Sequence, residues 1–292
     1  MALSHFEFFA PKSIEEAIKR LEDCGENAFI MAGGTDLLIK RRHQMIHPKV
    51  VVSLKQIKGL DRISYSRKKG LFIGATALLA DVAKHRSIKK FYPAIVKAAG
   101  NTANVQIRNM GTVVGNLCNA SPAADNAPTL LALNAELNIQ GPLGRRVLPL
   151  EDFFVGPGLT ALQQAEIVTS IVVPPLPTGS GAAYLHLSAR GKIDCSAANT
   201  GVFLQLRHKK IDTARLFIGA CGPTPMRMRK AEKKLTGCKL TDALAHQAGQ
   251  LASRESKPIS DVRADEDYRL KMVTVLTKRA IKDAYQLAIT NN

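Results

Sequence analysis

The feature of this sequence that most constrains its fold is an abrupt Gly-Gly turn inside FIMAGGTDLLIKRR, residues 29–42. The apolar run before the turn predicts a buried strand, the segment after it predicts a helix, and KVVVSL at 49–54 predicts a second strand. Gly33 and Gly34 lack a Cβ, so the backbone there can approach a neighbouring group closely. The result is a predicted βαβ unit whose turn lies at the carboxyl end of a strand, where open α/β sheets bind ligands. On this motif alone, a tight turn without a ligand is the simpler interpretation.

Length, hydrophobicity and cysteine usage limit the class of protein. The chain has 292 residues and 46% hydrophobic content, enough for a sizeable core and about two domains. No apolar run reaches the roughly 18 residues of a membrane helix, and the first residues do not resemble a secretory signal. The five cysteines lie far apart without a CxxC pair, which argues against a disulfide framework, a zinc site or an iron–sulfur cluster in this chain. We therefore expect a reducing, cytoplasmic compartment and no metal site.

The net charge of +17 has more than one interpretation. Basic residues are spread along the chain in short clusters, so a solvated basic surface is the simplest one. An acidic protein partner comes second. Nucleic acid comes third, because nucleic-acid binders interleave aromatic with basic residues, and here aromatics make up only 5% and Trp is absent.

The remaining pattern predicts alternating helices and strands with a boundary at PPLPTGSG, residues 174–181. Ser13 and Glu16 predict a capped helix at the start of the chain. The other expected elements are a hairpin around 67–70, helices at 78–88 and 91–104, strands at 166–173, 182–189, 196–207 and 213–222, and helices from about 230 onward.

The longest stretch without periodicity, residues 106–128, is a second candidate binding loop. A carboxylate in it suits the hydroxyl groups of a ribose, while hydroxyl, amide and glycine N–H groups suit a pyrophosphate. An Asx-turn-rich structural loop with a capped helix at 121–125 explains the same residues, and both interpretations stay open. Its polar and glycine residues are Gly111, Gly115, Asn116, Asn119, Ser121 and Asp125.

Common catalytic and nucleotide motifs are missing from the sequence. There is no GxGxxG, no GxxxxGK[ST], no HExxH and no GxSxG, so a Rossmann fingerprint, a P-loop, a zincin and a hydrolase nucleophile elbow are not indicated. We therefore expect no catalytic side chain of these kinds.

AGGTDLL at 32–38 followed by QIRNMGTVVGNLCNASPAADNAPTLLAL at 106–133 resembles the two FAD-binding loops of a known family. It is the flavoprotein (medium) subunit of molybdenum hydroxylases, as in xanthine dehydrogenase and carbon monoxide dehydrogenase. Flanking segments, including FEFFAPKSIEEAI at 6–18 and GACGPTPMRMRKAE at 219–232, extend the resemblance over essentially the whole chain.

The resemblance implies an α+β fold in three parts. Two subdomains, 1–57 and 58–176, would bind FAD in the manner of the vanillyl-alcohol-oxidase (PCMH) type. A C-terminal domain, 177–292, would contain a three-stranded antiparallel sheet and a helical bundle. A cysteine-rich insertion for a [4Fe–4S] cluster, known in one subgroup, is not expected, because only Cys118 lies between residues 100 and 190.

The resemblance also implies which residues bind FAD. The first loop would cradle the pyrophosphate, the second would add further contacts, and Asp125 would hold a sugar hydroxyl. Val168 and His186 would lie near the flavin ring. The implied cofactor-binding residues are Ala32, Gly33, Gly34, Thr35, Asp36, Leu37, Ala103, Thr112, Gly115, Asn116, Asn119, Asp125, Val168 and His186.

Two positions depart from the family pattern. Val114 stands where the family usually has the first glycine of T-x-G-G-N, and a β-branched residue would be strained there if that glycine has positive φ. His186 stands where many relatives carry Lys, and would be a weaker, pH-dependent positive charge beside the flavin. A half-buried structural histidine is the alternative, with Arg190 and Lys192 as other sources of charge, although these two are expected to face solvent.

The implied function is an FAD-carrying electron-transfer subunit of a heteromeric molybdenum hydroxylase, an oxidoreductase. Its partners would be a [2Fe-2S] small subunit and a molybdenum-cofactor large subunit, with NAD, quinone, ferredoxin or oxygen as the terminal acceptor. One alternative is a degenerate assembly subunit that has lost FAD, supported only by Val114. The other is a stand-alone FAD oxidoreductase, for which the sequence shows no covalent flavin anchor or catalytic base.

Overall fold

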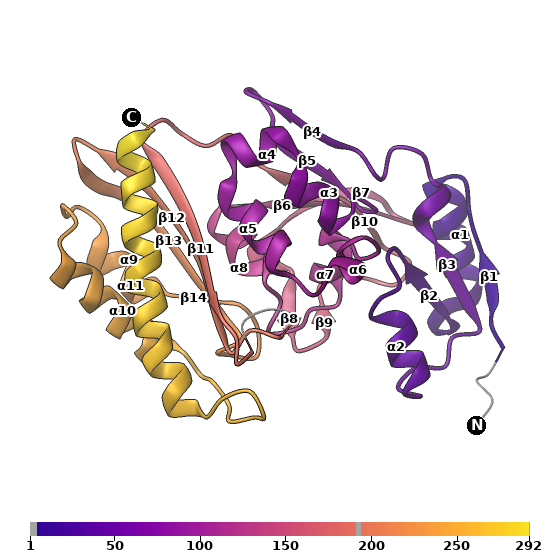
Figure 1. Ribbon diagram of the computed structural model, residues 1–292. Helices are drawn as coiled ribbons and strands as arrows, with labels where there is room; N and C mark the ends of the chain where they lie inside the picture. The colour runs from indigo at the N-terminus through magenta and orange to yellow at the C-terminus, as the bar shows by residue number, and fades with distance from the viewer. Residues whose placement is uncertain (1–4, 191–193, 292) are drawn as a thin grey trace.

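The computed structural model describes residues 5–190 and 194–291, so Lys192 lies outside the described residues (Figure 1). Three larger sheets follow one another along an elongated molecule. The small N-terminal sheet lies at one end, and the C-terminal sheet with the long helix α11 (Glu266–Thr290) lies at the other. This mixture of separate sheets and helices agrees with the predicted α+β class.

The predicted βαβ unit is present in the N-terminal part. Its elements are β1 (Glu7–Phe9), α1 (Ile14–Cys24), η1 (Gly25–Asn27), β2 (Ala28–Met31), α2 (Leu37–Arg42) and β3 (Val50–Ser53). The three strands form a parallel sheet in the order β1-β3-β2. Helix α1 begins where the Ser13 hydroxyl accepts a hydrogen bond from the Glu16 N–H group at 3.1 Å, as its sequence predicts. The turn from β2 to α2 therefore stands at the carboxyl end of β2.

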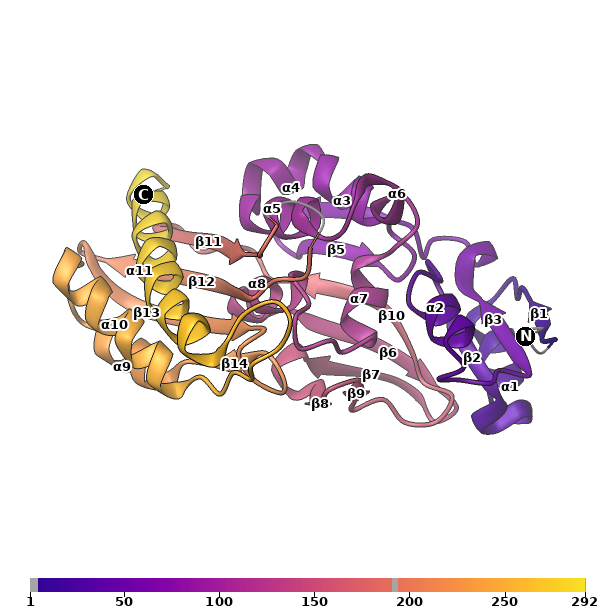
Figure 2. The ribbon, with the colours of Figure 1, turned by 60° about the horizontal axis from the view of Figure 1, so that its bottom comes forward.

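The central part contains a five-stranded antiparallel sheet in the order β4-β5-β10-β6-β7. Figure 2 shows helices α3 to α6 together along one side of this sheet. The predicted hairpin is β4–β5, whereas the predicted helix at 78–88 is broken into α3 and α4 at His85. The elements are η2 (Leu54–Gln56), β4 (Ile63–Ser66), β5 (Gly70–Gly74), α3 (Leu79–Lys84), α4 (Arg86–Phe91), α5 (Pro93–Asn101), α6 (Val105–Arg108), α7 (Val113–Cys118), α8 (Asn126–Ala132), β6 (Glu136–Gly141), β7 (Gly144–Pro149), η3 (Leu150–Asp152), β8 (Phe154–Gly156), β9 (Leu159–Thr160) and β10 (Ile167–Val173).

The stretch 106–128 is more ordered than its composition predicts. It holds the end of α6, the whole of α7 and the start of α8, so the expectation of one long irregular loop is wrong. No helix forms at 121–125 either. All seven residues of α8 are buried, and this helix packs against β11, β12 and β13 of the C-terminal sheet. Tertiary packing on both sides stabilises short helices that propensity alone does not predict.

The C-terminal part has one strand more than predicted. Its elements are β11 (Ser180–Leu187), β12 (Ala198–Arg207), β13 (Lys210–Gly219), β14 (Met226–Arg227), α9 (Arg229–Leu235), α10 (Asp242–Glu255) and α11. The strands form an antiparallel sheet in the order β11-β12-β13-β14. Ala280, Ala284 and Ala288 are fully buried at a spacing of four residues, so one face of α11 lies close against this sheet. The other sheet face joins the core of the central part through Tyr184, Phe203 and Phe217.

Candidate functional site

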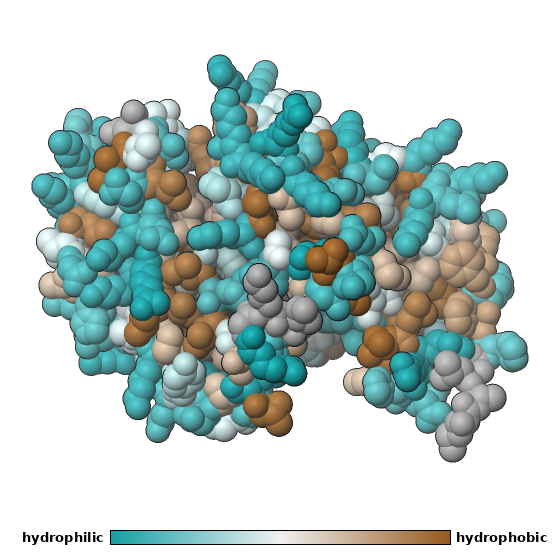
Figure 3. All heavy atoms as spheres, in the orientation of Figure 1, coloured by the Kyte–Doolittle hydropathy of each residue, from teal (hydrophilic) through white to brown (hydrophobic). Residues whose placement is uncertain are grey.

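A cleft of about 670 Å³ opens between the lobe that carries α2 and the central part. Its walls come from the turn between β2 and α2, the segment that holds α6 and α7, and the first residues of β10. Figure 3 shows the molecule hollowed at its lower edge beside the lobe that carries α2. Cofactor pockets typically enclose about 300–1,000 Å³, so the cleft has the size of a cofactor site.

Thirteen of the fourteen residues predicted to bind the cofactor line this cleft, and His186 is the exception. The two glycine-bearing segments therefore face one cavity although about seventy residues separate them. The thirteen are Ala32, Gly33, Gly34, Thr35, Asp36, Leu37, Ala103, Thr112, Gly115, Asn116, Asn119, Asp125 and Val168.

The first loop presents a row of backbone donors to the cleft. Gly34 has a φ of +75°, a conformation that strongly favours glycine, and it turns the chain from β2 toward α2. In the part of the chain that the structure describes, the N–H groups of residues 33–37 have no hydrogen-bond acceptor, and all five residues line the cleft. Neighbouring N–H groups without acceptors are the donor set that the oxygens of a phosphate or pyrophosphate require.

Gly33 makes room for the second loop. A Cβ at this position would lie 2.7 Å from the Gly111 Cα atom and would clash with the Met110 carbonyl group. The backbones of the two loops therefore approach each other closely at Gly33, a contact that the sequence did not predict. It brings the donors of the first loop beside the polar residues of the second.

Helix α7 forms part of the cleft wall that the second loop contributes. The Thr112 hydroxyl accepts a hydrogen bond from the Gly115 N–H group at 2.9 Å and so caps the helix. Val114 lies inside α7, its φ is not positive, and its side chain is only 4% exposed at the edge of the cleft. The backbone strain considered for a β-branched residue at this position does not arise.

Asn119 links the two loops through a chain of hydrogen bonds. Lys40 Nζ donates to Asn119 Oδ1 at 2.7 Å, and the Asn119 amide donates to Asp36 Oδ1 at 3.0 Å. Burial raises the pKa of Asp36, and the nearby Lys40 ammonium group partly opposes this effect. Lys40 also lines the cleft and was not predicted from the sequence. Its spacing of four residues from Asp36, which places both on one helix face, was the only signal for it.

Asp125 connects the cleft with the C-terminal sheet. It is only 6% exposed, and its Oδ1 atom accepts three hydrogen bonds from the C-terminal part. The donors are the Tyr184 hydroxyl at 2.7 Å, the Ser196 hydroxyl at 2.6 Å and the Asn199 amide at 3.2 Å. Burial, together with the charge of Asp125, raises the pKa of Tyr184, so its phenol stays a hydrogen-bond donor at neutral pH.

His186 lies behind this network. Its Nδ1 atom is 3.4 Å from the Ser196 hydroxyl, and its ring stacks on Tyr184 with 6.0 Å between the ring centroids. The histidine is half-buried and reaches Asp125 through Ser196. A role for His186 beside the flavin stays a prediction.

Glu166 also lines the cleft, and no sequence signal pointed to it. Arg146 donates to Glu166 through Nε at 2.6 Å and through a second nitrogen at 2.7 Å, and these hydrogen bonds lower the pKa of Glu166. Arg190 pairs with Asp194 at 3.4 Å while its side chain is 80% exposed, in agreement with the expectation that it faces solvent. Both pairs neutralise charge at the rim of the cleft.

The described residues contain no helix that is long and apolar enough to cross a membrane. Among the same residues, no group of three or more His, Cys, Asp or Glu side chains is arranged to hold a metal ion.

Comparison with known proteins identifies the family. Residues 4–176 match the FAD-binding domain of molybdopterin dehydrogenases, and residues 183–284 match the C-terminal domain of the CO dehydrogenase flavoprotein. The chain belongs to the FAD-binding subunits of the molybdenum hydroxylases. This FAD-binding subunit is 29% identical to the xanthine dehydrogenase FAD-binding subunit of Escherichia coli O157:H7, over 94% of each chain. It is 30% identical to the carbon monoxide dehydrogenase medium chain of Hydrogenophaga pseudoflava, over 96% of this chain and 97% of that one.

Solved structures confirm the predicted fold class of the FAD-binding subunit. Carbon monoxide dehydrogenase from Hydrogenophaga pseudoflava superimposes with a TM-score of 0.93 at 30% identity, covering 98% of this chain and 99% of that one. Quinoline 2-oxidoreductase from Pseudomonas putida 86 gives a TM-score of 0.92 at 27% identity, covering 99% and 100%. The resemblance seen in the sequence is therefore confirmed, as are the class of enzyme, an oxidoreductase subunit, and its cofactor, FAD.

The residues of the cleft fit FAD. The row of N–H groups at 33–37 supplies donors for a pyrophosphate, and Asp125 supplies a carboxylate for a sugar hydroxyl. Val168 and its neighbour Ile167 add an apolar wall suited to a flat ring. Lys40, on α2, adds a positive charge to the wall of the cleft, and its ammonium group donates a hydrogen bond to Asn119.

Proposed function

We propose that this chain is the electron-transfer subunit of a heteromeric molybdenum hydroxylase and carries FAD in the cleft between its two glycine-bearing loops. The observation that carries the proposal is the convergence of thirteen expected cofactor-binding residues on one cleft, with the N–H groups of residues 33–37 left without acceptors among the described residues. When bound, FAD accepts electrons and passes them on to an acceptor.

In this proposal the residues of the chain bind and orient the cofactor. The N–H groups of the first loop hold the pyrophosphate, and the Thr112 cap fixes the start of α7 opposite them. All three hydrogen bonds from the C-terminal part reach Oδ1 of Asp125. Asp125 therefore holds a sugar hydroxyl with its other carboxylate oxygen. Lys40 offsets the negative charge of the pyrophosphate beside Asp36. No side chain is assigned as a proton-transfer catalyst.

The partners proposed are a [2Fe-2S] subunit that delivers electrons and a molybdenum subunit that oxidises the substrate. Relatives named medium chain or medium subunit, such as the carbon monoxide dehydrogenase and nicotine 6-hydroxylase subunits, support a multi-subunit enzyme. The net charge of +17 fits an acidic partner. NAD is one candidate for the terminal acceptor. Five unpaired cysteines fit a reducing compartment, the cytoplasm.

We also propose the boundaries 1–57, 58–176 and 177–292 for the two FAD-binding subdomains and the C-terminal domain. The first boundary falls between the sheet that ends with β3 and the sheet that begins with β4, and the second falls between β10 and β11. The alternative of a degenerate scaffold subunit depended on strain at Val114, and the helical backbone there gives it no support.

Anaerobic mixing tests the proposal. The FAD-loaded chain is mixed with the iron–sulfur partner, which has been reduced with dithionite and desalted, and flavin absorbance near 450 nm is followed. We expect the flavin to bleach only when the reduced partner is present. Bleaching of the isolated chain by organic substrates, without any partner, would support a stand-alone oxidoreductase and contradict the proposal.

A further inference from the structure

One part of the central region carries a large share of the net positive charge of the chain. Between Arg62 and Asn101 the sequence holds nine lysines and arginines and a single acidic residue, Asp81. This stretch therefore carries an excess of eight positive charges out of the net +17, although it makes up only about one seventh of the chain. A solvated surface normally mixes both signs of charge.

The fold brings most of these cations onto one face. The β4–β5 hairpin is attached to α4 by stacking of Tyr65 on Phe91, with 4.3 Å between the ring centroids. The hairpin tip and α4 thus lie side by side, and Figure 3 shows hydrophilic side chains projecting at the top of the molecule, where Figure 1 places them. The basic face consists of Arg67, Lys68, Lys69, Lys84, Arg86, Lys89 and Lys90, all exposed.

The charge of the basic face is not neutralised within the chain. None of its seven cations forms an ion pair within the described residues, whereas some arginines and lysines of the C-terminal part pair with Glu151, Glu232, Asp242 and Asp261. Seven neighbouring unpaired cations repel one another, and an acidic partner would relieve this repulsion.

The composition of the basic face favours a protein over nucleic acid or a membrane. Its two aromatic rings, Tyr65 and Phe91, stack on each other and are half-buried, so neither is free to stack on a base. No large exposed hydrophobic residue lies between residues 46 and 104, so no apolar side chain is available to insert into a bilayer.

We infer that the basic face docks an acidic surface of a partner subunit and steers that subunit during assembly. The inference rests on the proposed heteromeric function and adds the surface and the chemistry of its partner. Lysines dominate the face, and lysines act at the rim of an interface through long-range attraction more than through burial. Assembly should therefore be fast at low salt and slow at high salt.

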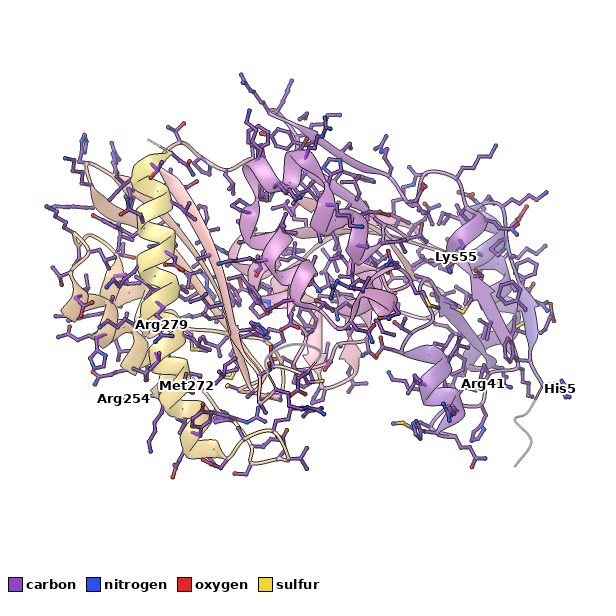
Figure 4. The ribbon with its side chains drawn as sticks, in the orientation of Figure 1. His5, Arg41, Lys55, Arg254, Met272 and Arg279 are labelled. Atoms are coloured by element: carbon purple, nitrogen blue, oxygen red, sulfur yellow. The ribbon has the colours of Figure 1, made fainter. Side chains whose placement is uncertain are left out.

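Charge reversal tests the inference with a matched control. The test variant is Lys68→Glu/Lys69→Glu/Lys89→Glu/Lys90→Glu. The control variant, Arg254→Glu/Lys257→Glu/Lys271→Glu/Arg279→Glu, makes the same change in charge on and around α10 and α11, where Figure 4 labels Arg254 and Arg279 at the opposite end of the molecule from α2. Each chain is co-expressed with its iron–sulfur and molybdenum subunits, and the complex is quantified by size exclusion, together with FAD content and Tm.

We expect the test variant to keep its Tm and FAD content and to assemble at least tenfold less than the wild type at 150 mM NaCl. The control should assemble as the wild type does. Loss of FAD in every chain would count against the proposed function and not against the basic face. Normal assembly of the test variant, or an equal loss in the control, would overturn the inference. It would also be overturned if the reversals left assembly intact but abolished binding to a single-stranded oligonucleotide or to phosphatidylserine vesicles.

Discussion

The backbone of Gly33 packs directly against that of Gly111, so that a Cβ on Gly33 would lie 2.7 Å from the Gly111 Cα atom. This contact joins the two loops that line the cleft. The first loop contributes the N–H groups without acceptors, and the second contributes the capped helix α7. The shape of the cofactor site thus depends on the absence of a side chain at Gly33.

Gly33→Ala should separate the two loops. We expect the free energy of unfolding to fall by roughly 1–3 kcal/mol, as in overpacked cores, and FAD affinity to fall at least tenfold. Thermal melts and FAD fluorescence quenching measure the two effects. Gly100→Ala is the matched control. Gly100 lies within α5, and a Cβ there would come no closer than 4.0 Å to the Ala83 side chain. The control should keep FAD affinity and gain up to about 1 kcal/mol of stability.

Substitutions of Asp125 and of its donor Tyr184 should differ in their effect on FAD affinity. Tyr184→Phe removes one hydrogen bond and should reduce the free energy of unfolding by about 1 kcal/mol with little change in FAD affinity. Asp125→Ala leaves three donors without their acceptor. It should reduce the free energy of unfolding by about 3 kcal/mol and weaken FAD binding at least tenfold. Tyr285→Phe, at an exposed hydroxyl on α11, serves as the control. Equal loss of FAD affinity in Tyr184→Phe and Asp125→Ala would mean that Asp125 acts only through the sheet contact.

The pair of Glu166 and Arg146 predicts how stability depends on pH. Because the folded state lowers the pKa of Glu166, its contribution is complete above about pH 4.3 and is lost as pH falls through the lowered pKa. Glu166→Gln should therefore lower Tm at pH 7, by an amount that corresponds to about 1 kcal/mol. The difference between variant and wild type should shrink below pH 4. A constant difference across this range would show that the charge of Glu166 does not contribute.

Val114 should be a structural residue of α7 and not an obstacle to FAD. Val114→Ala should reduce the free energy of unfolding by roughly 1–2 kcal/mol because the side chain is buried. Val114→Gly should reduce it by about 1 kcal/mol more because glycine disfavours a helix. We expect FAD affinity to stay within threefold of the wild type in both variants. A gain of tenfold or more in Val114→Gly would show that the valine narrows the site.

The sequence was sufficient to predict features that depend on residues close to one another in the chain. The Ser13 cap, the βαβ unit and the β4–β5 hairpin follow from spacing, turn residues and apolar runs within a few positions. Thirteen residues that line the cleft were also predicted to bind FAD, since the resemblance covers both glycine-bearing loops.

Features that depend on distant partners were not predicted. Helix α7 was missed because glycine, valine and asparagine have low helix propensity, and its stability comes from burial of Val113, Val114 and Leu117. The contact of Gly33 with the second loop crosses 77 positions to Met110, and the donors to Asp125 lie 59 to 74 positions away. No periodicity or motif encodes such contacts.

The most direct measurement is an FAD titration of the purified chain, followed by flavin fluorescence and by absorbance near 450 nm. We expect saturable binding of one FAD per chain, weakened at least tenfold by Gly33→Ala and unchanged by Gly100→Ala. A wild-type chain that melts cooperatively yet shows no saturable FAD binding, alone or with its partner subunits, would contradict the assignment of the cleft as the FAD site.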